Sequence, residues 1–226
     1  MLYSKIKTDL KRVYDDLSVY WGKDESLHDW GVAQLEEFAS MIQGNKPGLW
    51  GNFQTRFEKV KKKPKVLDLG CGSGVQLKML AGLGLSVVGL DLSPKMIKEA
   101  QIKAPKAKFV VGDMSNMKFA KNSFDGVYAR ASLLHIPKKL IPKVLSSIYK
   151  ILKKKGVLYL AVKEGEGENE VEDEKHGQKV KRFFSFFQMS ELESFLEEAG
   201  FKIIKATKFK RAKISTNWLQ VFAKKA

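Results

Sequence analysis

Apolar residues in the N-terminal quarter of the chain recur at intervals of three and four. This spacing places them on one face of a helix. We therefore expect amphipathic helices over residues 1–58. The two runs that show the pattern are Leu10, Val13, Tyr14 and Leu17, and Val32, Leu35, Phe38, Ala39 and Ile42.

From residue 65 onwards, short continuous apolar runs alternate with segments of helical period. This alternation predicts an α/β fold, a doubly wound and mostly parallel sheet with right-handed crossovers. Ligands of such sheets bind at the carboxyl ends of the strands. Strands are expected at 65–69, 86–90, 108–111, 126–129 and 156–162, and helices at 75–83, 94–103 and 138–152.

Residues 163–182 interrupt the alternation, because an acidic, glycine-rich stretch is followed there by a basic one. Such a composition favours a mobile loop or lid beside the site. Two further strands are expected, near 201–209 and 214–223, joined by a turn around Arg211. The sheet should therefore end in a hairpin with one antiparallel edge strand. We predict a single domain, with a helical cap (1–58) in front of a ligand-binding part (59–226).

The stretch from Val66 to Gly74 reads Val-Leu-Asp-Leu-Gly-Cys-Gly-Ser-Gly. Strand, glycine turn and helix in this order open a nucleotide-binding βαβ unit. The glycines tolerate positive φ and let a ligand lie against the backbone. However, the third glycine comes one residue too early for a dinucleotide fingerprint. In addition, Asp68 would repel a pyrophosphate.

This form resembles the first motif, E/D-x-G-x-G-x-G, of the class I S-adenosylmethionine-dependent methyltransferases. The resemblance implies a seven-stranded, Rossmann-like sheet and S-adenosyl-L-methionine as the cofactor, whose ammonium and sulfonium an acidic residue can complement. It also implies that Asp113, after the third strand, accepts from the adenine amino group, with Met114 against the adenine face. The alternative for Asp113 is a turn or N-cap residue.

Asp91 ends the second strand, 21 residues after Gly70, where an acidic residue accepts hydrogen bonds from ribose hydroxyls. Its alternative role is to cap the helix that follows. In the N-terminal segment, Tyr14-Asp15 and Tyr20 resemble a family pair that reaches the methyl donor, and packing onto the core is the alternative. The expected cofactor-binding residues are Asp68, Gly70, Cys71, Gly72, Gly74, Asp91, Leu92, Asp113, Met114, Arg130 and Tyr20.

Candidate catalytic chemistry follows the fourth strand, where residues 130–135 lie at the ligand-binding end of the sheet. His135 is the best candidate for a general base, because histidine titrates near neutrality. A structural histidine that packs beside the cofactor is the alternative. Cys71, the one cysteine, is expected to fill space in the turn rather than act as a nucleophile. Three scattered histidines without carboxylate companions predict no metal site.

Charge adds a second possibility, because the chain carries a net charge of +16. A strongly basic surface suits nucleic acid. Yet only five of the 41 basic residues are arginine, the residue that makes bidentate phosphate and base contacts. A general preference for lysine therefore competes with a true polyanion-binding face.

We therefore interpret the chain as an enzyme, an S-adenosylmethionine-dependent methyltransferase that methylates a small-molecule acceptor by in-line displacement. One alternative is a tRNA or rRNA methyltransferase that uses the lysine-rich surface. Another is a non-catalytic subunit of the same fold that binds a partner. We expect a cytoplasmic monomer or homodimer without membrane contact, since no apolar run approaches about 20 residues and no signal peptide is visible.

Overall fold

A computed structural model describes residues 2–21, 31–44, 62–210 and 217–226. The predicted boundary at 58/59 and the turn at Arg211 lie outside these residues. No helix in the described ranges is both long and apolar enough to cross a membrane.

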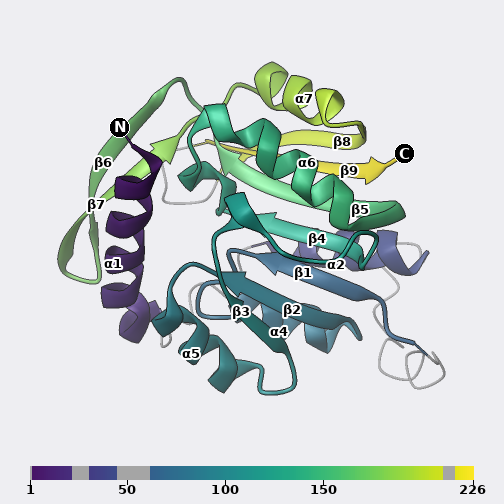
Figure 1. The fold of residues 1–226 in the computed structure, drawn as a ribbon, viewed down its shortest axis with the longest axis horizontal. Helices are drawn as coiled ribbons and strands as arrows, with labels where there is room; N and C mark the ends of the chain where they lie inside the picture. Colours follow the sequence, from purple (N-terminus) through teal and green to yellow (C-terminus); the bar gives the residue numbers. More distant parts are fainter. Residues whose placement is uncertain (1, 22–30, 45–61, 211–216) are drawn as a thin grey trace.

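A sheet with the order β3-β2-β1-β4-β5-β9-β8 is the centre of the described fold (Figure 1). The first five strands pair in parallel, which confirms the doubly wound, mostly parallel seven-stranded sheet. The strands are β1 (Lys65–Leu69), β2 (Ser86–Asp91), β3 (Lys108–Val111), β4 (Phe124–Arg130), β5 (Leu152–Lys163), β8 (Phe201–Lys210) and β9 (Asn217–Lys225).

The sheet ends in a hairpin, as predicted, but the antiparallel strand is not at the edge. β9 is inserted between β5 and β8 and runs antiparallel to both. The edge strand β8 therefore has the same direction as β1–β5. Because of this insertion, the strongly apolar β9 has a paired strand on each side, whereas the lysine-rich β8 lies at the edge of the sheet. Lysine side chains suit an edge strand, because its outer backbone groups are unpaired and charge there discourages pairing with another chain.

Helices cover both faces of the sheet, α6 and α7 one face and α2, α4 and α5 the other (Figure 1). Each buries the apolar stripe that its sequence predicts. In α5, Ser93 accepts a hydrogen bond from the Met96 amide and Pro94 opens the first turn, which fixes the helix start. The bounds are α2 (Val32–Gln43), α4 (Val75–Gly82), α5 (Pro94–Lys103), α6 (Ile141–Ile151) and α7 (Met189–Glu198), with short 3-10 turns η3 (Met114–Asn116), η4 (Leu133–His135) and η5 (Lys138–Leu140).

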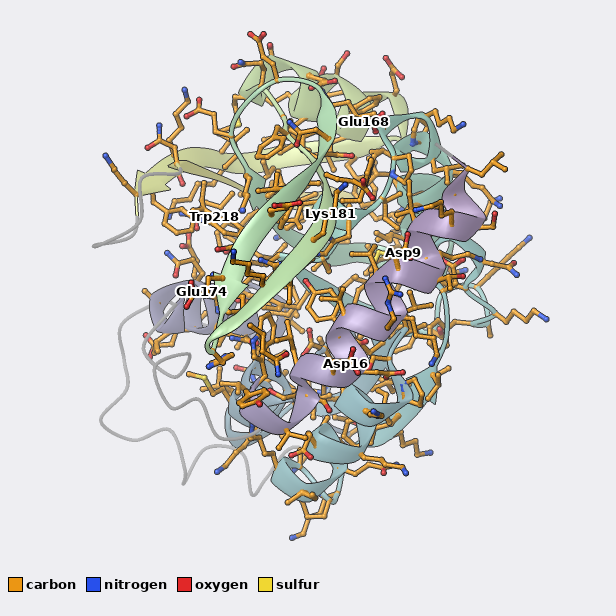
Figure 2. All side chains as sticks on the ribbon, turned by 90° about the vertical axis from the view of Figure 1, so that its left-hand side faces the viewer. Asp9, Asp16, Glu168, Glu174, Lys181 and Trp218 are labelled. Carbon is orange, nitrogen blue, oxygen red and sulfur yellow. The ribbon has the colours of Figure 1, made fainter. Side chains whose placement is uncertain are left out.

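The N-terminal helix α1 (Tyr3–Trp21) stands across the carboxyl ends of the parallel strands, beside a two-stranded ribbon (Figures 1 and 2). The ribbon consists of β6 (Glu168–Lys175) and β7 (Gln178–Ser185). Phe183 of the ribbon packs against Ile6 and Leu10 of the helix. Helix and ribbon thus form a joint cover over one end of the sheet.

The ribbon corrects the prediction of an irregular loop at 163–182. Its acidic strand and its basic strand neutralise each other, with ion pairs of 2.9 Å from Lys181 to Glu170 and from Arg182 to Asp173. Opposite charges across an antiparallel pair stabilise it, so a segment too polar to form a core still forms a hairpin.

Candidate functional site

A cavity of about 840 Å³ lies between the carboxyl ends of the strands and the cover formed by α1 and the ribbon. Its volume falls within the roughly 300–1,000 Å³ of small-molecule sites. The predicted residues that line it are Gly70, Cys71, Gly72, Asp91, Leu92, Asp113, Met114, Arg130 and His135. In the described part of the chain, Asp68, Gly74 and Tyr20 are not among its lining residues.

The three glycines of the turn differ in what they do. Gly70 has a φ of 78°, and a Cβ there would lie 2.4 Å from the Cβ of Ser132. Gly72 also has positive φ, and a Cβ there would meet nothing within 4 Å in the described structure. Gly74 instead brings α4 against α5, since a Cβ would lie 2.8 Å from the Cα of Ala100. Gly70 and Gly72 therefore shape the cavity, whereas Gly74 allows two helices to pack.

Asp91 links the end of β2 to the glycine turn. Its carboxylate accepts 2.8 Å and 2.9 Å hydrogen bonds from the amides of Gly72 and Ser93. The carboxylate lines the cavity with lone pairs left to accept further bonds. Burial raises its pKa. Capping of α5 falls to Ser93 itself, so the ribose role of Asp91 keeps its geometric basis and stays a prediction.

Asp68 lies on β1, beneath the turn, and is 3% exposed. Burial and the nearby Asp91 charge raise its pKa to about 8, against the opposing effect of Arg130. Its Oδ2 has no hydrogen-bond partner among the described residues. A buried carboxylate oxygen without a partner is costly, and a cationic group nearby would reduce that cost.

Asp113 is engaged by the N-terminal helix. Its carboxylate accepts 2.8 Å hydrogen bonds from the Tyr3 hydroxyl and the Ser115 amide, and it pairs with Lys7 at 2.9 Å. The bond to Ser115 makes it the N-cap of η3, which is the alternative weighed from the sequence. The predicted hydrogen bond from the adenine amino group to Asp113 is untested. In that arrangement the Asp113 carboxylate would bind adenine as well as Tyr3 and Lys7 of α1.

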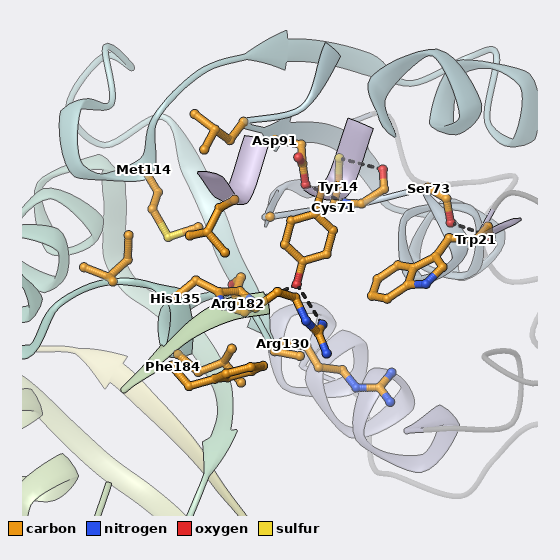
Figure 3. Close-up of a pocket in the computed structure, with 18 of the residues that line it drawn as sticks. Tyr14, Trp21, Cys71, Ser73, Asp91, Met114, Arg130, His135, Arg182 and Phe184 are labelled. Carbon is orange, nitrogen blue, oxygen red and sulfur yellow. Dashed lines mark hydrogen bonds between the residues drawn. The ribbon is translucent and has the colours of Figure 1, made fainter. Parts of the chain in front are cut away.

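The buried His135 and the half-buried Tyr14 form a hydrogen-bonded pair in the cavity (Figure 3). His135 Nδ1 lies 2.7 Å from the carbonyl oxygen of Phe183. Because a carbonyl can only accept, Nδ1 holds the proton and Nε2 accepts from the Tyr14 hydroxyl at 2.6 Å. Burial, with the charges of Arg182 and Lys163, lowers the His135 pKa to about 3. The imidazole is therefore neutral at physiological pH.

Of the two tyrosines that the sequence suggested for the site, Tyr14 lines the cavity and Tyr20 does not. Tyr20 is 40% exposed and stacks on His176 at the tip of the ribbon, outside the cavity. Tyr14 and Trp21 line the cavity instead, with their rings edge to face at 5.5 Å. Asp15 binds the start of α5, where it accepts a hydrogen bond from the Ser93 hydroxyl.

Lys163, Arg182 and Phe184 also line the cavity, and of these Lys163 and Arg182 were not expected there. Lys163 is the last residue of β5, and strand ends in this fold point at the ligand. Its position at the end of a predicted strand could therefore have identified Lys163 from the sequence. Arg182 had no such signal, because the ribbon that presents it was expected to be a loop.

The cavity also encloses the thiol of Cys71, which is 4% exposed. Burial raises the pKa of this thiol well above its ordinary value. A thiol that stays protonated is a poor nucleophile. The side chain therefore contributes packing beside Asp91, in keeping with its expected role as a filler of the turn.

Comparison with known proteins matches residues 67–160 to a family described as a methyltransferase domain. An uncharacterized methyltransferase of Synechocystis sp. is 31% identical over 135 residues, 59% of this chain and 62% of that protein. Sterol 24-C-methyltransferase of Saccharomyces cerevisiae is 32% identical over 162 residues, 68% of this chain and 40% of that protein. The chain thus spans less than two thirds of either relative.

Among solved structures, 1,6-didemethyltoxoflavin-N1-methyltransferase of Burkholderia thailandensis aligns with a TM-score of 0.72 at 20% identity. The alignment covers 100% of this chain and 91% of that one. That protein was crystallised with 1,6-didemethyltoxoflavin and S-adenosylhomocysteine. At this identity the likeness establishes the fold alone.

Proposed function

We propose that this chain, which contains a class I S-adenosylmethionine-dependent methyltransferase domain, transfers a methyl group to a small-molecule acceptor. The observation that carries the proposal is the cavity itself. It joins the glycine turn, Asp91 and the Tyr14–His135 pair under one cover of α1 and the ribbon.

The residues present fit the proposed cofactor, S-adenosyl-L-methionine. The backbone at Gly72 is open to a ligand, because no atom of the described residues lies within 4 Å of the position that a Cβ would take there. Asp91 would accept from the ribose hydroxyls, and Leu92 and Met114 offer apolar contacts from the same wall. The Oδ2 of Asp68 has no partner among the described residues, and a cationic ligand beside it would favour the ionised form of this carboxyl group.

The bound cofactor would supply a methyl group already activated by a sulfonium. The chain then has to orient the acceptor and exclude water. These two effects supply much of the acceleration of such a displacement. Tyr14, Trp21 and Phe184 line the cavity from the cover and would exclude water. His135 holds no proton on Nε2, and its lone pair accepts from Tyr14. His135 would therefore act on an acceptor through the Tyr14 hydroxyl, as a positioning residue.

A small acceptor is favoured over RNA by the cover. Helix α1 is fixed to the body through Tyr3 and Asp113 at one end and through the Trp21 carbonyl and Ser73 at the other. A folded nucleic acid would have to displace this helix to reach the cavity. Contacts from α1 to α5 and β7, and from α2 to β5, also support the prediction that cap and sheet form one domain.

The proposal is tested first by titration calorimetry with S-adenosylhomocysteine. Binding of one equivalent is expected, and the absence of binding would overturn the assignment in favour of a partner-binding subunit. Transfer of a labelled methyl group from S-adenosylmethionine is then compared between a cell extract's small-molecule fraction and its total RNA. Label in the small-molecule fraction supports the proposal, whereas label in RNA alone contradicts it.

A further inference from the structure

We propose, on the basis of the methyltransferase function inferred above, that the acceptor carries an oxyanion, a carboxylate or phosphate group, bound by Lys163 and Arg182. These residues lie where the end of β5 meets the ribbon. Neither is among the residues assigned to the cofactor above, and Arg182 donates a 3.4 Å hydrogen bond to the Tyr14 hydroxyl on the acceptor side of the cavity.

Both cations are fixed on one aromatic ring. Lys163 Nζ lies 4.0 Å from the centroid of the Phe184 ring, and the Arg182 guanidinium carbon lies 5.1 Å from it. All three side chains line the cavity. Arg182 is 6% exposed, and its Nε has no hydrogen-bond partner within the described residues. A buried donor without a partner is costly and is ready to bind an acceptor atom.

Positive charge exceeds negative charge at this position. Arg182 pairs with Asp173 at 2.9 Å, and the same carboxylate oxygen also pairs with Lys175 at 3.1 Å. Lys163 has no ion pair with any residue that the structure describes. Three cations therefore share one carboxylate. Burial and the Arg182 charge lower the pKa of Lys163, as expected for a cation that lacks a counterion.

The other acidic residues that line the cavity are committed elsewhere or turned away. Asp91 accepts from two backbone amides, and Asp113 pairs with Lys7. Glu172 and Glu174 alternate with Asp173 along β6, so their side chains lie on the opposite face of the ribbon from Arg182, which shares its face with Val171 and Asp173. Lys181, which pairs with Glu170 on this opposite face, lies on the ribbon beside Asp9 of α1 (Figure 2).

An oxyanion fits these donors better than a neutral group does. Guanidinium and ammonium groups bind carboxylate and phosphate through charge-assisted hydrogen bonds, which are about twice as strong as neutral ones. The Phe184 ring provides an apolar wall beside the charge. An uncharged apolar acceptor such as a sterol would cover the half-buried Lys163 without supplying a counterion, which is expensive. The structure therefore favours an anionic acceptor.

The test uses two pairs of probes that differ in charge, benzoate with benzamide and phenyl phosphate with phenol. Each is titrated by calorimetry into protein saturated with S-adenosylhomocysteine. The anionic member of at least one pair is expected to bind at least about tenfold more tightly than its neutral partner. The pair that shows the preference identifies carboxylate or phosphate as the group.

Lys163→Met and Arg182→Met should each abolish this preference, while Lys163→Arg should retain most of it. Lys154→Met is the matched control, because Lys154 is an exposed lysine at the other end of the same strand. All variants should bind S-adenosylhomocysteine like the wild type, which shows that they are folded. Equal or absent binding of charged and neutral probes overturns this inference alone. Failure of the wild type to bind S-adenosylhomocysteine overturns the proposed function instead.

Discussion

The hydroxyl of Tyr14 donates a 2.6 Å hydrogen bond to Nε2 of His135, across 121 residues of sequence. The bond joins the N-terminal helix to the turn that follows β4. The other ring nitrogen of His135 donates to the Phe183 carbonyl of the ribbon. One imidazole thus connects the sheet to both parts of the cover.

Tyr14→Phe removes the hydroxyl and leaves the His135 lone pair buried without a partner. We expect a loss of about 1–3 kcal/mol in the free energy of unfolding and a strong decrease in methyl transfer. Affinity for S-adenosylhomocysteine should change little. Urea denaturation and calorimetry measure the two effects.

The control for this variant is Tyr20→Phe, the same change on the same helix at an exposed site. It should alter stability by less than about 0.5 kcal/mol and leave cofactor affinity intact. A large loss of affinity in Tyr20→Phe would restore the role that the sequence suggested for this residue.

Asp91→Asn is expected to weaken binding of S-adenosylhomocysteine at least tenfold, about 1.4 kcal/mol. The amide cannot accept from both backbone amides and from a ribose at once. Asp125→Asn is the control, since Asp125 is the second residue of β4, at the opposite end of the sheet, and pairs with Lys153. Equal affinities of wild type and Asp91→Asn in calorimetry would refute the ribose role.

Asp68 predicts an unusual dependence of stability on pH. Its folded pKa is about 8, whereas the unfolded value is about 3.9. Between these pH values the folded state holds a proton that the unfolded chain releases, so the Asp68 contribution to stability falls as pH rises from about 4 to 8. Asp68→Asn lacks this term and should gain stability relative to the wild type, by at least about 1 kcal/mol between pH 5 and pH 8.

Urea denaturation at the two pH values measures this difference, with the exposed Asp16→Asn on α1 as the control. Asp16→Asn should follow the wild type at both. We further expect Asp68→Asn to bind S-adenosylmethionine more weakly, because the cationic ligand would lower the pKa of the Asp68 carboxyl group and pair with its ionised form, whereas an asparagine cannot ionise. A variant that is both destabilised at pH 8 and unchanged in affinity would contradict the interpretation.

Asp113→Ala should loosen the cover, because Asp113 holds Tyr3 and Lys7 of α1. Hydrogen exchange is expected to accelerate in the amides of residues 3–21 and to stay constant in β1 and β4. Lys5→Met serves as control, since the exposed Lys5–Asp9 pair lies within α1 and does not connect this helix to the sheet. Unchanged exchange in Asp113→Ala would show that the helix is held by its apolar face alone.

Much of the fold and one wall of the cavity could be predicted from the sequence, because they depend on local patterns of residues. Alternating apolar runs and helical periods determined the order of strands and helices, since each element buries its own apolar face. The glycine turn and the strand-end position of Asp91 identified one wall of the cavity, because parallel strands bring their carboxyl ends to one edge. These features depend on neighbours close in sequence or on a topology with few alternatives.

The tertiary structure alone decided what faces that wall. A helical period shows which side of α1 is apolar, yet it does not show which surface that side covers, so Tyr14 and Tyr20 could not be ranked. The ribbon escaped prediction because its stability comes from charges that neutralise each other across the strands, as in Arg182 and Asp173. Long-range contacts of this kind leave no period in the sequence, and here they determine what the cavity can bind.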